Sequence, residues 1–282
     1  MSDAMPVRVQ HHTFAIGEAV SVTRAPDLRL RGLVRGAYHG WTERTEGTHR
    51  RREVPVLMVP LILNLGPAFG VYSPGNPSGG MEDFGSFAAG VHEGHAVDET
   101  RGRSHCLQVN LTPLGARRVL GIGMHAIANR VVALEDVLGR EAPLLAERLH
   151  GTASWAARFA ILDEALARRA QAGPAPAPEV AWALGRIEAT GGRVAIGDLA
   201  EAIGCSRKRL ARRFCEDVGL GPKRLARIAR FEAAVRGLAA GEDLAALALD
   251  CGYYDQAHFN REFRELAGCT PTAFLREGGQ PH

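Results

Sequence analysis

The chain has almost no lysine, few aromatic residues and no long hydrophobic run. Only two of its 34 basic residues are lysines, Lys208 and Lys223, and phenylalanine, tryptophan and tyrosine make up 6% of the 282 residues. The longest nearly unbroken apolar run, Val54–Leu63, contains two prolines. It is about half as long as the roughly 20 residues that a membrane helix needs. A membrane protein is therefore not expected.

Cysteine is also scarce, and its spacing matches neither a disulfide framework nor a zinc site. The five cysteines are odd in number and never spaced as C-x-x-C, which predicts reduced thiols. The first twelve residues lack an apolar core behind a positively charged end, so no secretory signal peptide is expected. Both features predict a cytoplasmic protein.

The sequence does contain enough apolar residues to form the cores of two globular domains. Hydrophobic residues make up 46% of the chain and charged residues 23%. The segment Ala172–Pro178 holds three prolines in seven residues, which favours an extended spacer over a helix. We therefore expect a first domain at 1–171, a linker at 172–178 and a second domain at 179–282.

The two expected domains differ in their periodicity. Residues 11–111 read as strands and turns, with a turn-rich segment at Gly75–Gly80 and strict alternation at Leu107–Leu111. From Thr112 onwards, and throughout 179–276, apolar residues recur at helical spacing. The predicted fold class is α+β, with a β-rich, barrel-like first domain that ends in helices and an all-α second domain.

The second domain contains an internal repeat. Residues 199–204 and 247–252 align at an offset of 48, which becomes 49 after one extra residue. The later matches are Leu210 with Phe259, Phe214 with Phe263, Gly219 with Gly268 and Pro222 with Pro271. Each copy reads as a short helix, a turn at glycine, a second helix and a glycine stop, which predicts two helix-turn-helix units.

The second helix of each unit has a distinctive outward face. In the first copy Ser206 is the expected N-cap, and Arg207, Lys208 and Arg209 fill the first turn, where the helix dipole disfavours cations. An anionic partner would explain this placement. In the second copy the outward residues are Gln256, Ala257, Asn260, Arg261 and Arg264. Arginine, glutamine and asparagine suit the base edges of the DNA major groove.

Charge and length support a nucleic-acid partner. Residues 207–236 contain ten Lys or Arg against three Asp or Glu, a local charge of +7 that would attract phosphates. A long helix is predicted from near Pro222 to about Ala240, which at 1.5 Å per residue spans roughly 27 Å. Such a helix would hold two recognition helices about one turn of DNA apart, close to 34 Å.

The stretch Gly252–Arg264, closing on Gly268–Pro271, strongly resembles the signature of AraC/XylS-family transcription regulators. The resemblance covers about 100 residues, 178–278. It implies a seven-helix domain with two helix-turn-helix units joined by a linker helix. Departures are small: Tyr253 stands where phenylalanine is usual, and Gly221 precedes Pro222 where serine or threonine is common.

By this resemblance the base-facing positions are Lys208, Ala211 and Arg212 in the first unit and Gln256, Ala257, Asn260 and Arg261 in the second. Arg207, Arg209 and Arg213 are expected to contact phosphates. Alanine at 211 and 257 restricts readout there to apolar contacts, for example with a thymine methyl.

The first domain resembles the amino-terminal halves of AraC-type regulators more loosely, chiefly through Arg130–Gly139. This resemblance implies a module that either binds a small effector or pairs two chains. Its aromatic residues either line a pocket or, more commonly, form the core, so no effector-binding residue is predicted. They are Tyr38, Trp41, Phe69, Tyr72, Phe84 and Phe87.

One alternative function rests on histidines. His92 and His95, with Glu93, Asp98 and Glu99 nearby and His105 beyond, form the only ligand-like cluster, although the spacing is not H-E-x-x-H. They leave open a metal-dependent β-barrel enzyme fused to a DNA-binding domain. No phosphate-binding loop, nucleophile elbow or dinucleotide fingerprint occurs, so we expect no catalytic residue, metal or cofactor.

The sequence therefore predicts a sequence-specific, DNA-binding transcription regulator that is not an enzyme. Its expected partner is double-stranded DNA with a two-part operator. RNA polymerase, a small-molecule effector and a second copy of the chain, paired through the first domain, are further candidate partners. Activation is the commoner role in the family.

Overall fold

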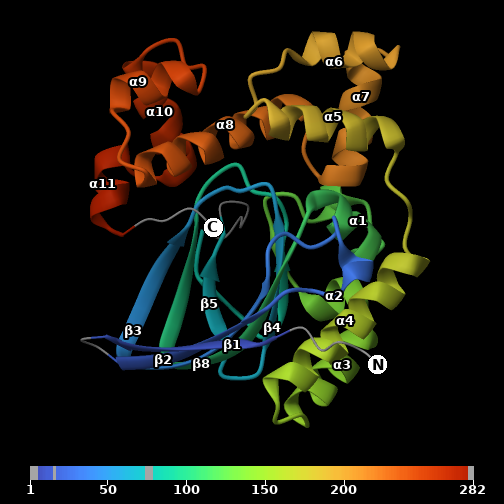
Figure 1. The fold of residues 1–282 in the computed structure, drawn as a ribbon, viewed down its shortest axis with the longest axis vertical. Helices are drawn as coiled ribbons and strands as arrows, with labels where there is room; N and C mark the ends of the chain where they lie inside the picture. The colour runs from blue at the N-terminus through green and yellow to red at the C-terminus, as the bar shows by residue number, and fades with distance from the viewer. Residues whose placement is uncertain (1–5, 15–16, 74–78, 279–282) are drawn as a thin grey trace.

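The structure is a computed structural model, and it describes residues 6–14, 17–73 and 79–278. Most of the predicted turn at Gly75–Gly80 lies outside these residues. Figure 1 shows a curved sheet beside one group of helices, with the carboxy-terminal helices lying across the end of the sheet.

The amino-terminal domain is built on one antiparallel sheet, which confirms the β-rich prediction. Its described strands are β1 (Arg8–Phe14), β2 (Gly17–Arg24), β3 (Tyr38–Glu53), β4 (Val59–Asn64), β5 (Phe69–Tyr72), β6 (Glu82–Phe84), β7 (Phe87–Ala89), β8 (Ala96–Leu111) and β9 (Val131–Ala133). The order is β1-β2-β3-β8-β4-β7-β9, with β5 on β8 and β6 on β5. Among the described residues β1 does not pair with β9, so the sheet is curved but open and the barrel is not closed.

The two longest strands give the sheet its curvature. β3 and β8 pair along their length, with a register irregularity between Arg44 and Thr48 that allows the strands to bend. On its other side β8 pairs with β4 and with β5. The predicted alternation at Leu107–Leu111 is confirmed at the end of β8, where the three apolar side chains are buried and the two polar ones are half-buried.

Helices follow the sheet as predicted. They are α1 (Pro113–Leu120), α2 (Leu134–Leu138), α3 (Glu141–His150) and α4 (Trp155–Ala172), with short 3-10 turns η1 (Leu28–Leu30) and η2 (Met124–Ala126). Thr112 caps α1 by accepting a hydrogen bond from Gly115 N, and Pro113 occupies the first turn, where no N–H is needed.

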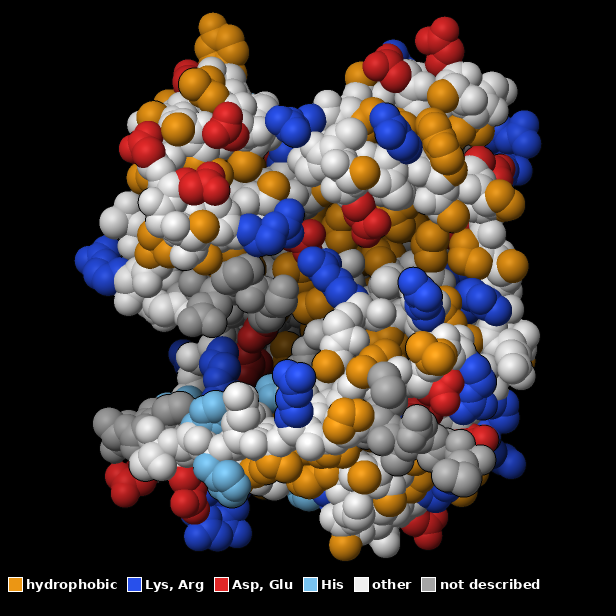
Figure 2. Space-filling view, in the orientation of Figure 1, with side chains coloured by type: hydrophobic (Ala, Val, Ile, Leu, Met, Phe, Trp, Pro, Cys, Tyr) orange, Lys and Arg blue, Asp and Glu red, His pale blue; other side chains and the backbone are white. Residues whose placement is uncertain are grey.

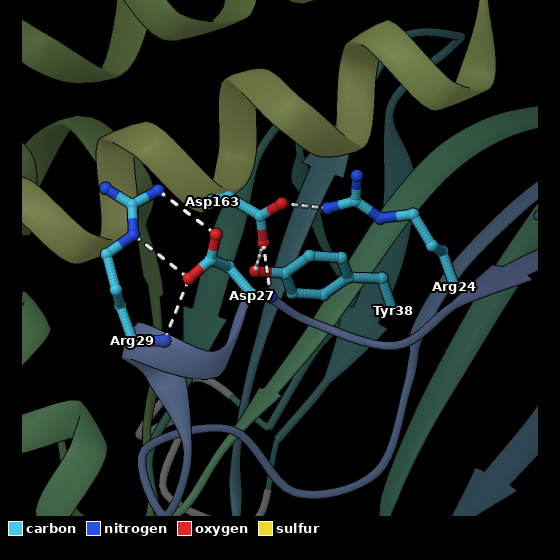
Figure 3. A network of polar contacts seen from close by, with 5 residues as sticks. All are labelled: Arg24, Asp27, Arg29, Tyr38 and Asp163. Carbon is cyan, nitrogen blue, oxygen red and sulfur yellow. Dashed lines mark hydrogen bonds and ion pairs between the residues drawn. The ribbon is translucent and has the colours of Figure 1, made fainter. Parts of the chain in front are cut away.

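A buried polar network holds α4 against the sheet (Figure 3). Asp163 of α4 forms an ion pair with Arg24 of β2, and accepts hydrogen bonds from Tyr38 Oη at 2.9 Å and Asp27 N at 2.9 Å. The Arg24 guanidinium lies over the rings of Tyr38 and Phe159. Because the partners of Asp163 come from residues more than 120 positions away, this network fixes α4 to the start of the sheet.

The described residues after 177 form helices and no strand, which confirms the all-α prediction. They are α5 (Pro178–Ala189), α6 (Ile196–Ile203), α7 (Arg207–Val218), α8 (Pro222–Ala239), α9 (Leu244–Asp250), α10 (Gln256–Ala267) and α11 (Pro271–Arg276). We call α6 with α7 the first helix pair and α9 with α10 the second helix pair; α8 joins them (Figure 1). No described helix combines the length and apolarity needed to cross a membrane.

The two helix pairs belong to different hydrophobic cores. Leu210, Phe214 and Val218 of α7 lie in a core that continues into the amino-terminal domain through residues such as Val119 and Met124. The second helix pair packs around α8 in a core of its own, centred on Phe231, Phe259 and Phe263, and Val54 is its one described member from the amino-terminal domain.

Candidate nucleic-acid interface and regulatory cavity

Each helix pair turns at a glycine in the left-handed conformation and begins its second helix at a side-chain cap. The turns contain Gly204, with φ 70°, and Gly252, with φ 78°, a region that favours glycine. Ser206 caps α7 by accepting from Arg209 N, as predicted, and Asp255 caps α10 by accepting from His258 N at 2.6 Å. The two pairs therefore present α7 and α10 in the same local manner.

The residues predicted to contact DNA all reach the surface. The exposed ones are Arg207, Lys208, Arg209, Arg212, Gln256, Ala257, Arg261 and Arg264, and the half-buried ones are Ala211, Arg213 and Asn260. They lie on the outward sides of α7 and α10, opposite the buried stripes at Leu210 and Phe259. Both faces are therefore accessible from solvent.

The amino-terminal domain holds α7 at its carboxyl end. Arg117 of α1 pairs with Glu216 at 3.1 Å and with Asp217 at 3.3 Å. His125 lies 3.2 Å from Glu216, and Asp217 also accepts from Ala177 N at 2.9 Å. These contacts leave the amino-terminal turns of α7, with their four cations, outside the interface.

The same domain also touches α10 at its carboxyl end. Arg52 donates to Ala267 O at 2.8 Å and pairs with Glu277 at 3.3 Å. The ring of His95 lies against Gly268, which ends the helix. The amino-terminal domain therefore contacts both α7 and α10 at their carboxyl ends.

Ion pairing narrows the predicted +7 patch. Arg213 pairs with Glu179 of α5, Arg224 pairs with Glu93 at 2.9 Å, and Arg227 pairs with Glu262 at 3.1 Å. Among the described residues no ion pair involves the other basic residues of α7. These are Arg207, Lys208, Arg209 and Arg212. Among the described residues, four unpaired cations therefore gather on the first two turns of α7, whereas α8 keeps only Lys223 and Arg236 unpaired.

A second feature is a cavity of about 590 Å³ in the hollow of the sheet. Its wall is largely apolar, and it includes Trp41, Phe69 and Phe87, which the sequence assigned to either a pocket or the core. In Figure 2 the molecule is hollowed between the sheet and the carboxy-terminal helices, with acidic and histidine side chains beside the opening. This volume suits a small organic molecule.

One wall of the cavity carries charge. Arg51 and Asp98 are directly paired residues of β3 and β8, with their charged atoms 3.9 Å apart, and Arg51 also pairs with Glu43 at 2.5 Å. Glu53 lines the same wall two residues along β3 from Arg51. Burial, reinforced by Glu53, raises the pKa of Asp98 to about 7, against the smaller opposing effect of Arg51.

The three histidines of the enzyme alternative do not converge. His92 lines the cavity, and burial lowers its pKa to about 4, whereas His95 lies at Gly268. His105 meets Arg158 at 2.9 Å on the α4 side of β8. The part of the chain that the structure describes contains no group of three His, Cys, Asp or Glu arranged to hold a metal ion.

The connection between β3 and β4, residues 54–58, lies between the cavity and the carboxy-terminal helices. Val54, Pro55 and Val56 line the cavity and also a small space beside Glu232 of α8. Glu232 accepts hydrogen bonds from Leu57 N at 2.9 Å and from Arg35 at 3.0 Å. This connection therefore links the cavity wall to the helix that joins the two helix pairs.

Sequence reasoning named Asp98, but it missed the other charged residues of the wall and this connection. No local pattern in the run Arg50–Glu53 indicates that Arg51 and Glu53 line a cavity. One available signal is alternation. Trp41 and Glu43 lie on the cavity face, and Arg51 and Glu53, which also stand at odd positions, lie on the same face beyond the irregularity after Arg44.

Comparisons with known proteins agree with this architecture. Residues 199–277 match the family model described as a helix-turn-helix domain. No curated protein matches the chain. The solved structure of ToxT from Vibrio cholerae is similar over 86% of this chain and 98% of that one, with 8% identity and a TM-score of 0.51, a likeness of fold alone.

Two shorter structures match the carboxy-terminal region. One is the carboxy-terminal domain of AraT, a response regulator from Geobacillus stearothermophilus, with 23% identity over 36% of this chain and 87% of that one, at a TM-score of 0.34. The other is a probable AraC family transcriptional regulator from Rhodopseudomonas palustris, with 28% identity over 37% of this chain and all of that one, at a TM-score of 0.33. The family match shows that residues 199–277 of this chain form a helix-turn-helix domain.

Proposed function

We propose that the protein reads two successive major-groove segments of one DNA duplex, one with α7 and one with α10. The observation that carries this proposal is the family match of residues 199–277, which spans both helix pairs. In the proposal Lys208 and Arg212 of α7, and Gln256, Asn260 and Arg261 of α10, contact base edges. Arg207 and Arg209 contact phosphates. Arg213 does so only by giving up its ion pair with Glu179.

The length of α8 supports this arrangement. Its 18 residues give roughly 27 Å at 1.5 Å per residue, close to the approximately 34 Å between major-groove segments one turn apart. Because both helices are held at their carboxyl ends, their amino-terminal turns are the parts free to enter a groove. This is the usual approach of a recognition helix.

The experiment is selection of bound duplexes from a random DNA pool by the full chain at near-physiological salt, where phosphate contacts alone do not dominate. We expect two short consensus blocks about ten base pairs apart. Arg261→Ala should relax the preference at one position and cost about 1–3 kcal/mol. Arg186→Ala, an exposed arginine of α5 outside the proposed face, is the matched control. A single block, or no consensus, would contradict the proposal.

We also propose that the amino-terminal domain controls DNA binding by holding a small molecule in the cavity. ToxT, whose fold is similar, has been solved with a naphthyl-butenoic acid bound. Residues 54–58 support control in this chain, because they line the cavity and contact α8. The break between α4, which ends at Ala172, and α5, which begins at Pro178, is the proposed domain boundary. Such a regulator would act in the cytoplasm, beside the DNA.

A further inference from the structure

We infer that the cavity binds a mostly apolar molecule that carries a protonated amine, held at Asp98. The inference rests on the proposed regulatory role of the cavity and names the class of molecule that would fill it. It stands on the placement of charged groups in the wall, on buried polar atoms without partners, and on the apolar remainder of the lining.

The first step is the register of the two long strands. Arg51 pairs with Asp98, and Glu53 pairs with Ala96, so that Glu53 and Asp98 are diagonal neighbours on the face that lines the cavity. The Oδ1 atom of Asp98 is buried and has no hydrogen-bond partner among the described residues. A buried carboxyl oxygen without a partner is costly, and a donor from a ligand would remove that cost.

The second step is the balance of charge. Three carboxyl groups line the cavity, from Glu43, Glu53 and Asp98, against one guanidinium, from Arg51. Arg51 is already engaged by Glu43, at 2.5 Å, and lies farther from Asp98, at 3.9 Å. Glu43 is therefore the closer partner of the arginine, and among the described residues no cation lies within hydrogen-bond distance of Asp98.

The histidines of the cavity do not supply a positive charge to Asp98. Burial lowers the pKa of His92 to about 4, and burial together with the nearby His12 lowers the pKa of His39. Both are therefore neutral near pH 7. The two ring nitrogens of His92 are also buried without a hydrogen-bond partner in the described part of the chain, so a further polar group of the ligand would find a donor or acceptor there.

The rest of the lining determines the body of the molecule. It is built from aromatic and aliphatic side chains, of which Trp41, Ile62, Phe69, Val71 and Phe87 are examples. Aromatic ring faces attract cations as well as apolar groups, whereas they do not attract a carboxylate. A carboxylate would also have to displace Glu43 from Arg51 while facing the remaining acids.

The test uses the full chain without DNA and measures binding by isothermal titration calorimetry. The probes are primary amines with a phenyl ring on chains of two to six carbons, each compared with the carboxylate and the alcohol of the same skeleton. We expect at least one amine to bind about tenfold or more tightly than its two counterparts, as for a charge-assisted hydrogen bond in a partly buried site.

Variants locate the amine. Asp98→Asn keeps the shape of the side chain and removes its charge, so it should weaken that amine about tenfold while leaving the alcohol unchanged. Asp83→Asn, a carboxyl of β6 that does not line the cavity, should change neither. If no amine in the series binds more tightly than its carboxylate, or if Asp98→Asn leaves the preference intact, the inference is overturned. Because no DNA is present, either failure is distinct from a failure of DNA recognition.

Discussion

The first and second helix pairs are copies of one unit, yet the molecule attaches them differently. The first helix pair shares a hydrophobic core with the amino-terminal domain and is held there by Arg117, whose side chain is 14% exposed. The second helix pair has its own core, and its contacts with that domain are the more exposed Arg52, the ring of His95, and Val54. Similar sequences thus give two units that differ in attachment. The first helix pair is packed into the amino-terminal domain, whereas the second packs mainly on α8 and makes few contacts with that domain.

This difference assigns distinct roles to the two pairs. Since the second helix pair meets the amino-terminal domain mainly through residues next to the β3–β4 connection, a change in the cavity would move α10 more readily than α7. We therefore expect regulation to act on the half of the operator that α10 reads, and the following predictions test the asymmetry.

The largest effect is expected from the matched core residues Phe214 and Phe263, which are both fully buried. Truncation of a buried phenylalanine to alanine costs about 3–5 kcal/mol. Phe214→Ala should lower the stability of the whole chain in one cooperative transition, because its core is shared. Phe263→Ala should loosen the second helix pair selectively.

Hydrogen exchange measured by mass spectrometry separates these outcomes. Phe263→Ala should speed exchange in α9, α10 and α11 while the sheet stays protected. Equal loss of protection in the sheet for both variants would remove the distinction between the pairs.

The next effect concerns the polar contacts that hold the pairs. Arg117→Ala leaves the buried carboxylate of Asp217 with one remaining donor, Ala177 N, and should cost about 3 kcal/mol of unfolding free energy. Arg52→Ala removes a more exposed contact and should cost about 1 kcal/mol. Denaturant titration of both variants measures the difference. Equal costs would mean that the two pairs are held alike.

How far the sequence could predict this arrangement depends on the range of the interaction. The repeat, the Ser206 cap and the helical face of α10 are local patterns, and they placed the helix pairs correctly. The ion pair of Arg213 with Glu179 joins different helices, and no spacing rule indicates it. A charge count along the sequence therefore treats Arg213 as uncompensated, although the folded chain pairs it with Glu179.

The charged wall of the cavity could not be predicted from the sequence for a related reason. Asp98 and Glu53 lie 45 residues apart and meet only because of the register of β3 on β8, which changes between Arg44 and Thr48. A slip of one residue would turn every later side chain of β3 to the other face. Whether the sheet closes likewise depends on pairing between distant strands. The sequence pattern could therefore predict a barrel-like domain, but not that the sheet is open.

A smaller effect links the cavity to pH. Because burial and Glu53 raise the pKa of Asp98 to about 7, with Arg51 opposing, the ionised fraction of this carboxyl rises steeply between pH 6 and pH 8. The affinity of an amine probe should therefore rise about tenfold over that range, equivalent to about 1.4 kcal/mol. His92 stays neutral throughout.

Calorimetric titrations at pH 6, 7 and 8 measure this dependence. Asp98→Asn should bind the amine more weakly and with an affinity that is flat in pH. An affinity that falls as the pH rises would show that another group controls binding.

The central claim, that α7 and α10 read separate segments of one operator, is tested most directly by comparing Arg212→Ala with Arg261→Ala on single-base variants of the selected duplex. We predict that each variant loses about 1–3 kcal/mol of discrimination in one block only, and that the two affected blocks lie about ten base pairs apart. Loss of discrimination in the same block for both variants, or in neither, would contradict the account.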